Sequence, residues 1–163
     1  MSESKTLQVT ARGEREIVMT RVFDAPRTVV WEAFTKPELL KRWLLGPPGW
    51  SMPVCKLASK VGESYRYEWR GPKGEEMGMS GILKEFVPPE RMVSTERFDQ
   101  PWYPGECVGT IELTEQNGRT TLTQTLRYES REARDMVLKS EMERGLGMSY
   151  DRLDEVLAVA AAK

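Results

Sequence analysis

The 163-residue sequence contains no histidine, and this absence excludes several kinds of catalytic site. Without imidazole the chain forms neither a Ser-His-Asp triad nor a Cys–His pair, and most zinc and non-haem iron sites lose their usual ligand. Cysteine is also scarce, because Cys55 and Cys107 are the only two and no CxxC motif occurs. We therefore expect no metal and no cofactor, and two buried reduced thiols in preference to a disulfide.

The chain also lacks an excess of charge of one sign and a long hydrophobic run. Its 24 basic and 25 acidic side chains are mixed along the sequence, unlike the one-sided basic face of a nucleic-acid-binding protein. The longest apolar run, residues 156–162, is too short to span a bilayer, and the charged N-terminus lacks the apolar core of a signal peptide. These features predict a cytoplasmic protein, a monomer or homodimer, that binds neither nucleic acid nor membrane.

What is present is an ordinary globular composition, with 39% hydrophobic and 30% charged residues. A chain of this length forms one domain most naturally, and no repeat, linker or low-complexity segment divides it. We expect residues 1–14 to be a flexible tail and residues 15–161 to form a single domain.

Apolar patterns divide that domain into successive elements. Residues 16–23 alternate as a strand does, and a helical period follows with Pro26 in its first turn. Pro37 is expected to begin a second short helix, after which the GPPG sequence stops helix formation. Five or six antiparallel strands follow, the clearest of them within residues 62–71, 76–87 and 91–98.

The C-terminal third predicts a hairpin and then a long helix. Asn117-Gly118 between two alternating segments is the strongest short hairpin signal in the chain. Ser130 is expected to cap a final helix that continues to about residue 160. Sequential antiparallel strands followed by a long helix indicate an α+β domain in which that helix lies across the sheet.

Several polar or aromatic residues share a face with predicted core residues. Tyr65, Tyr67 and Trp69 alternate on one face of their strand, and Gln124 shares a face with Leu122 and Leu126. The aromatic row is consistent with core packing or with the wall of a hollow. A buried amide requires partners, which a neighbouring side chain, a trapped water or a ligand can supply.

The strand at residues 91–98 has two candidate inner faces. We favour the face that carries Met92, Ser94, Glu96 and Phe98, because both of its ends are apolar. Glu96 is then an interior carboxylate, either with a raised pKa at a site or in a structural salt bridge with Arg66, Arg97 or another basic side chain. Glu85, on the preceding strand, has the same two interpretations.

The last helix contains Gly145 and Gly147 on either side of Leu146. Each glycine costs about 1 kcal/mol relative to alanine in a helix interior. Our hypothesis is that the glycines permit close backbone approach or a slight bend, while Leu146 points into a hollow. On this hypothesis, Gly145→Leu sharply destabilises the fold.

Three segments together resemble the START-like (SRPBCC, Bet v 1-like) superfamily. They are DAPRTVVWEAFTKPELLKRWL, GPKGEEMGMSGILKEFVPPER and MERGLGMSYDRLDEVLA. Within the superfamily the chain is similar to bacterial proteins related to the C-terminal domain of heat-shock protein 90 ATPase activators, over residues 15 to 160. The resemblance implies a helix-grip fold: a curved antiparallel sheet wrapped around a long C-terminal helix, with two short helices after the first strand and an interior cavity.

The resemblance implies that this cavity binds an apolar or amphipathic ligand, lipid-like or polyketide-like. Relatives commonly place tryptophan after the first glycine of the last helix, so Leu146 implies a wider cavity here. Glu96 is the candidate polar anchor. The expected cavity residues are Tyr67, Trp69, Glu96, Gln124, Met142, Leu146, Ser149 and Tyr150.

Two other functions stay open, and whether the protein is an enzyme is undecided. One is a co-chaperone-like module that contacts a chaperone partner through the loop aromatics Trp50, Trp102 and Tyr103. The other is a cyclase or lyase that uses Glu96, Tyr67 or an arginine in the cavity. No catalytic constellation is evident in the spacing of the residues.

Overall fold

The computed structural model describes residues 6–161, in which eight strands and four helices form. In chain order they are β1 (Gln8–Arg12), β2 (Glu16–Phe23), α1 (Arg27–Thr35), α2 (Pro37–Trp43), β3 (Ser51–Lys56), β4 (Ser64–Arg70), β5 (Glu76–Val87), β6 (Arg91–Phe98), β7 (Cys107–Gln116), β8 (Arg119–Arg127), α3 (Arg131–Leu138) and α4 (Met142–Ala161). The predicted bounds of β2, β5 and β6 and the start of α2 at Pro37 are confirmed.

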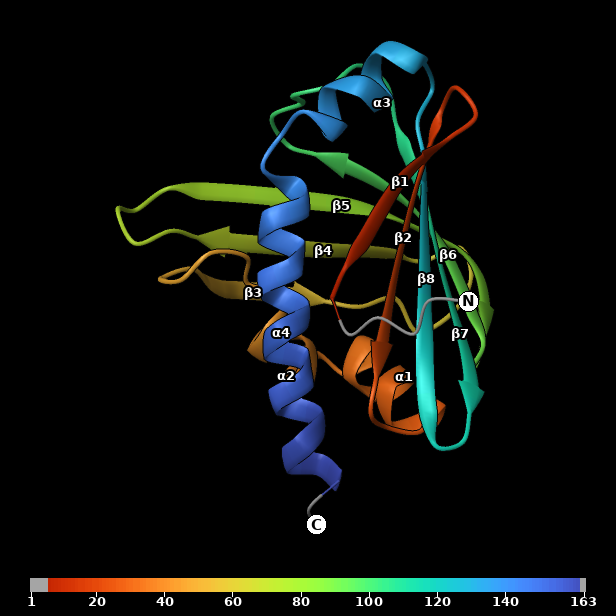
Figure 1. The fold of residues 1–163 in the computed structure, drawn as a ribbon. Helices are drawn as coiled ribbons and strands as arrows, with labels where there is room; N and C mark the ends of the chain where they lie inside the picture. The colour runs from red at the N-terminus through yellow and green to blue at the C-terminus, as the bar shows by residue number, and fades with distance from the viewer. Residues whose placement is uncertain (1–5, 162–163) are drawn as a thin grey trace.

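All eight strands belong to one antiparallel sheet with the order β1-β2-β8-β7-β6-β5-β4-β3. The register shifts between Leu83 and Glu85 on β5, and such a bulge bends a strand and increases its twist. In Figure 1, β4 and β5 run across behind α4, whereas β1, β2 and β8 run nearly upright beside it. The predicted α+β helix-grip fold is therefore confirmed: a curved sheet encloses the long C-terminal helix.

The hairpin between β7 and β8 forms where the Asn-Gly pair predicts it. Asn117 and Gly118 have φ values of 55° and 76°, so both central residues are left-handed, as a type I′ turn requires. The two strands then pair from Gln116–Arg119 to Val108–Arg127. This pairing carries Gln124 and Leu126 to the concave side of the sheet.

Helices α1 and α2 form a tight corner that closes one end of the sheet. Pro37 disfavours helical backbone at Lys36, which is extended, and α2 then starts at the proline. The Trp43 indole donates a hydrogen bond to the Ala33 carbonyl (3.0 Å), and its ring lies 4.8 Å from that of Phe34. The corner is thus fixed by a buried aromatic pair and one buried hydrogen bond.

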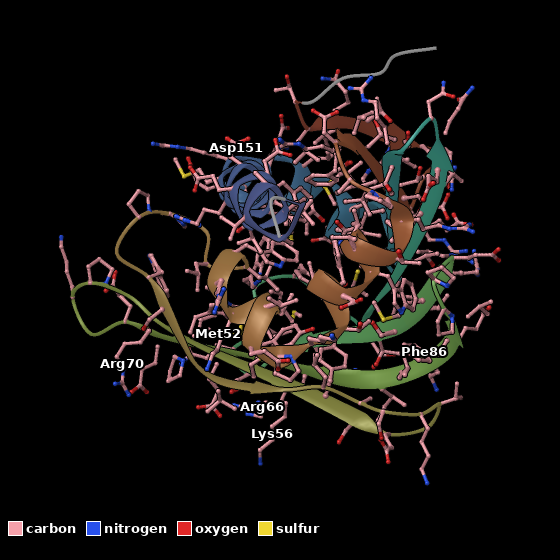
Figure 2. The ribbon with its side chains drawn as sticks, turned by 90° about the horizontal axis from the view of Figure 1, so that it is seen from below. Met52, Lys56, Arg66, Arg70, Phe86 and Asp151 are labelled. Atoms are coloured by element: carbon pink, nitrogen blue, oxygen red, sulfur yellow. The ribbon has the colours of Figure 1, made fainter. Side chains whose placement is uncertain are left out.

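An interior arginine fastens α4 to the sheet. Arg21 on β2 is only 2% exposed and donates hydrogen bonds to Asp151 (2.8 Å) and Asp154 (2.5 Å) on α4. Its guanidinium carbon also lies 5.0 Å from the centre of the Phe23 ring. Seen from below in Figure 2, α4 lies within the curve of the sheet, and Asp151 is on it.

Two sequence expectations about the chain's ends are wrong. Residues 8–12, expected in a flexible tail, form β1 and pair with β2 from Gln8–Thr20 to Arg12–Glu16; residues 1–5 lie outside the described part of the chain. The helix that Ser130 caps ends at Leu138, so the expected single helix is two. Ser140 divides them, because its hydroxyl donates to the Val137 carbonyl (2.6 Å) and accepts from the Met142 amide (3.2 Å).

The hypothesis that Gly145 and Gly147 permit close backbone approach is also wrong. A Cβ at Gly145 would lie 3.9 Å from Pro47 Cδ, an ordinary van der Waals distance, and one at Gly147 would meet nothing within 4 Å. The glycines therefore sit in a helix interior without a packing contact that requires them.

We expect Gly147→Ala to raise the free energy of unfolding by about 1 kcal/mol, because alanine loses less backbone entropy in a helix and has free space here. Urea unfolding measures the change, and Gly145→Ala is the matched variant with a similar expected gain. A loss of stability in both variants would restore a packing role for the glycines.

Candidate functional site

A cavity of about 620 Å³ lies between the concave face of the sheet and helices α2 and α4. Strand β4 contributes Tyr65, Tyr67 and Trp69 to its wall, and the helices contribute Trp43 and Tyr150 among others. Most of the wall is apolar or aromatic, with a few polar groups among these side chains. This size and composition are typical of a site for a small organic molecule.

Seven of the eight expected cavity residues line this space. They are Tyr67, Trp69, Glu96, Gln124, Met142, Leu146 and Tyr150. The eighth, Ser149, is not part of the wall: it is buried, and its hydroxyl accepts a hydrogen bond from the Gly46 amide (2.9 Å). Ser149 therefore ties α4 to the loop after α2, a role that helical spacing alone does not distinguish from lining the cavity.

The aromatic row on β4 forms a continuous part of the wall. Adjacent ring centres are 5.1 Å apart for Tyr65–Tyr67 and 5.6 Å apart for Tyr67–Trp69. The Tyr65 hydroxyl donates to the Thr95 carbonyl (2.5 Å), and the Trp69 indole donates to the Leu44 carbonyl (2.8 Å). The two outer side chains are thus fixed by hydrogen bonds, whereas the Tyr67 hydroxyl forms none with a described residue.

Gln124 and Tyr150 join the sheet to α4 across the cavity. The Tyr150 hydroxyl donates to Gln124 Oε1 over 2.6 Å, which answers the requirement that a buried amide be paired. The Gln124 side-chain nitrogen donates to no described residue. It therefore remains a donor at the cavity wall.

Glu96 is an interior carboxylate without a basic partner among residues 6–161. Arg66 pairs with Asp99 and Glu68, and Arg97 pairs with Glu106, so the alternative of a salt bridge to Arg66 or Arg97 is wrong. Burial alone raises the pKa of Glu96 to about 7.

A glycine on the neighbouring strand makes room for this carboxyl group. A Cβ at Gly109 would overlap Glu96 Oε2, so the missing side chain lets the carboxylate lie across β7. Met92 and Ser94 line the cavity beside Glu96, as expected, but Phe98 at the end of the same strand lies against Trp102 and Tyr103. Glu85 is exposed and pairs with Arg91, so its interpretation as an interior carboxylate is wrong.

Sequence reasoning missed the residues at the exposed rim of the cavity. Lys36 lies at the corner of α1 and α2, and its ammonium group contacts the Glu32 carboxylate at 2.7 Å. Leu57, Ala58 and Ser59 complete the rim from the segment after β3. Lys36-Pro37 interrupts the helical pattern and so predicts the corner between α1 and α2. No local pattern indicates that residues 57–59 line the cavity next to it.

A second hollow, of about 490 Å³, lies on the outer side of the sheet. Trp50 and Trp102 contribute to it beside Arg66 and Arg70. Figure 2 shows Arg66 and Arg70 on the side of the sheet away from the helices. Tyr103, expected to be an exposed loop aromatic, is only 7% exposed, whereas Trp102 is 37% exposed.

Within residues 6–161, no helix combines the length and the apolar character that a membrane span requires. The same residues contain no group of three or more Cys, Asp or Glu side chains arranged to hold a metal ion. No arginine lines the cavity, so the described residues do not support an arginine as a cavity acid or base.

A curved antiparallel sheet closed around a long C-terminal helix, with a hollow between them, defines the START-like helix-grip class. Residues 24–158 match the family described as Activator of Hsp90 ATPase homolog 1-like protein. The chain belongs to that family. The comparison with curated proteins gives no match.

Solved structures of bacterial proteins have the same fold. One from Rhodobacter sphaeroides is 32% identical, with a TM-score of 0.89 over 94% of this chain and 99% of that one. One from Chromobacterium violaceum is 27% identical, with a TM-score of 0.77 over 88% and 96% of the two chains. One from Nitrosomonas europaea has a TM-score of 0.82 over 94% and 100% at 24% identity, a likeness of fold alone.

Proposed function

We propose that the protein binds an apolar or amphipathic small molecule in the cavity between the sheet and α4. The observation that carries this proposal is the cavity itself: about 620 Å³, walled mainly by apolar and aromatic side chains, with Glu96 and Gln124 as polar groups that have free hydrogen-bonding capacity. Sites for organic ligands combine an apolar wall with a few placed polar groups in this way.

The family description also accommodates a chaperone-binding role. That role requires exposed apolar side chains, but Tyr103 is buried and packs on Tyr128 with ring centres 5.2 Å apart. The Trp102 ring in turn packs on Tyr103 at 5.0 Å. The cavity is therefore a stronger basis for function than the loop aromatics.

We expect a ligand present at 100 times its Kd to raise Tm by about 5–10 °C, since binding to the folded state alone adds about 2.7 kcal/mol. Thermal-shift measurements with fatty acids, sterols, aromatic polyketides and the fluorescent probe N-phenyl-1-naphthylamine test this. Leu146→Trp should abolish the shift, because the indole ring would occupy the space that Leu146 leaves open in the cavity.

The matched control is Val159→Trp, which adds tryptophan to an exposed position of the same helix (59% exposed) and should leave the shift unchanged. The proposal fails if no compound stabilises the wild type, or if Leu146→Trp binds as well as Val159→Trp.

A further inference from the structure

The charges along the cavity wall are few and unevenly placed. Among the residues of the described chain that line the cavity, Lys36 and Glu96 are the only Lys, Arg, Asp or Glu side chains. Lys36 stands at the rim, half exposed, with its ammonium group held by Glu32. Glu96 stands between β5 and β7, where no described side chain donates a hydrogen bond to it. The interior of the cavity therefore has an unbalanced negative group.

Aromatic rings surround the rest of the interior. Four of the rings come from β4, α2 and α4: Tyr67, Trp69, Trp43 and Tyr150. Phe34 on α1 and Phe86 on β5 also line the cavity, and the Phe86 ring centre lies 5.5 Å from that of Trp31 on α1. The face of an aromatic ring is negative and attracts a cation, with tryptophan the strongest. The carboxylate and the ring faces thus both favour a positively charged ligand.

Three ligand classes differ in how they meet Glu96. An anionic ligand would place a like charge against it in a medium of low dielectric constant. A neutral ligand would leave the ionised carboxylate without a counter-charge, which is unfavourable for a buried group. A cationic ligand supplies the counter-charge and a charge-assisted hydrogen bond at once.

Resting on the proposed function, we propose that the preferred ligand is a hydrophobic amine whose protonated nitrogen binds Glu96 and whose apolar body lies among the aromatic rings. Ser94 lies two residues before Glu96 on β6, and Tyr67 interacts electrostatically with Glu96. Both line the cavity, and their hydroxyls supply further acceptors for the ammonium protons. Gly109 is the residue that gives the carboxylate room to present its oxygens to such a ligand.

Protonation links this preference to pH. Six titratable groups interact electrostatically with Glu96. They are Tyr65 and Tyr67 on β4, Cys107 on β7, Tyr150 on α4, and Tyr103 and Tyr128 in the segments before β7 and after β8. Burial raises the pKa of each of these groups, so they remain neutral and Glu96 alone changes charge near neutral pH. Since a primary alkylamine remains protonated up to about pH 10, affinity for it should rise as pH increases and Glu96 ionises.

The test compares 4-phenylbutylamine with 4-phenylbutan-1-ol, which has the same body and a neutral head. Isothermal titration calorimetry and displacement of N-phenyl-1-naphthylamine measure both compounds against wild type and Glu96→Gln at pH 5 and pH 8. In wild type at pH 8 the amine should bind about tenfold or more tightly than the alcohol. The preference should shrink at pH 5 and vanish in Glu96→Gln, which should still bind the alcohol.

The outcomes separate this inference from the proposed function. If both compounds or the naphthyl probe bind but the amine has no advantage that Glu96→Gln removes, the amine inference is overturned and ligand binding stands. If neither compound nor the probe binds to wild type, the amine inference is overturned, and the proposed function falls with it only when the fatty acids, sterols and polyketides also fail to stabilise the protein. Binding of the alcohol to Glu96→Gln is the internal evidence that the variant's cavity is intact.

Discussion

Glu96→Gln should raise the free energy of unfolding by about 3 kcal/mol at pH 8, while leaving it nearly unchanged at pH 4. Burial raises the pKa of Glu96 from 4.5 to about 7, so the folded state holds a proton that the unfolded state has released between these two pH values. The contribution of Glu96 to the free energy of unfolding is therefore largest below about pH 4.5, and it is lost as pH rises through 7. Glutamine keeps the shape of the neutral acid and does not ionise.

Urea unfolding of wild type and variant across pH 4–8 measures this difference, and other carboxylates cancel because both proteins contain them. Glu14→Gln, which removes the same charge from an exposed turn, is the matched control. If the free energies of unfolding of wild type and Glu96→Gln change with pH in parallel, the carboxylate is not buried in the folded protein. A cation bound at Glu96 should reduce the difference, because it favours the ionised form.

An unpaired interior carboxylate lowers stability without improving the packing of the fold. The same sheet pairs Arg66 with Asp99 and Arg91 with Glu112 on its outer side, so counter-charges are available to this architecture. The cavity instead places Glu96 among tyrosines, with Gly109 making room for it. A polar group that lines a cavity and lowers the stability of the folded protein is characteristic of a binding or catalytic site.

Sequence patterns predict the fold well where turn residues bound an alternating run. Proline and glycine set the ends of β5 and β6, and Asn117-Gly118 sets the hairpin after β7. Strand β1 was missed because four of its five residues are exposed, so it has no apolar alternation and exists through pairing with β2. The end of α3 was missed because Ser140 divides the helices through hydrogen bonds, not through the apolar pattern.

The site was less predictable, because it depends on which residues the curved sheet brings together. Parity on each strand correctly places Tyr67, Glu96 and Gln124 on the cavity side. The same parity puts Arg66 on the outer face, away from Glu96, but it does not indicate that Asp99 is the partner of Arg66, since that depends on pairing between β4, β5 and β6. Nor does helical spacing show that Ser149 faces the loop at Gly46. Contacts between distant segments decide both cases.

Gly81→Ala should lower the free energy of unfolding by about 3 kcal/mol, because the new methyl group would overlap backbone that has little room to move. A Cβ at this position of β5 would overlap the Thr95 carbonyl oxygen and lie 2.7 Å from Tyr65 Cε1. That carbonyl accepts the Tyr65 hydroxyl, and the Thr95 hydroxyl accepts the Ile82 amide (2.9 Å). Displacing Thr95 therefore disturbs both hydrogen bonds, next to Glu96.

Gly78→Ala, on the same strand, is the matched control. Its Cβ would overlap the Asp99 carboxylate and approach the Arg66 guanidinium at 2.7 Å, but these are ends of flexible side chains in a surface ion pair. Such a pair contributes about 1 kcal/mol or less, so the control should lose no more than that. Equal losses in the two variants would contradict the argument. We expect Gly81→Ala to be the less stable of the two variants and to lower the apparent pKa of Glu96. That result would show that the Thr95 carbonyl holds β6 in the position that buries this carboxylate.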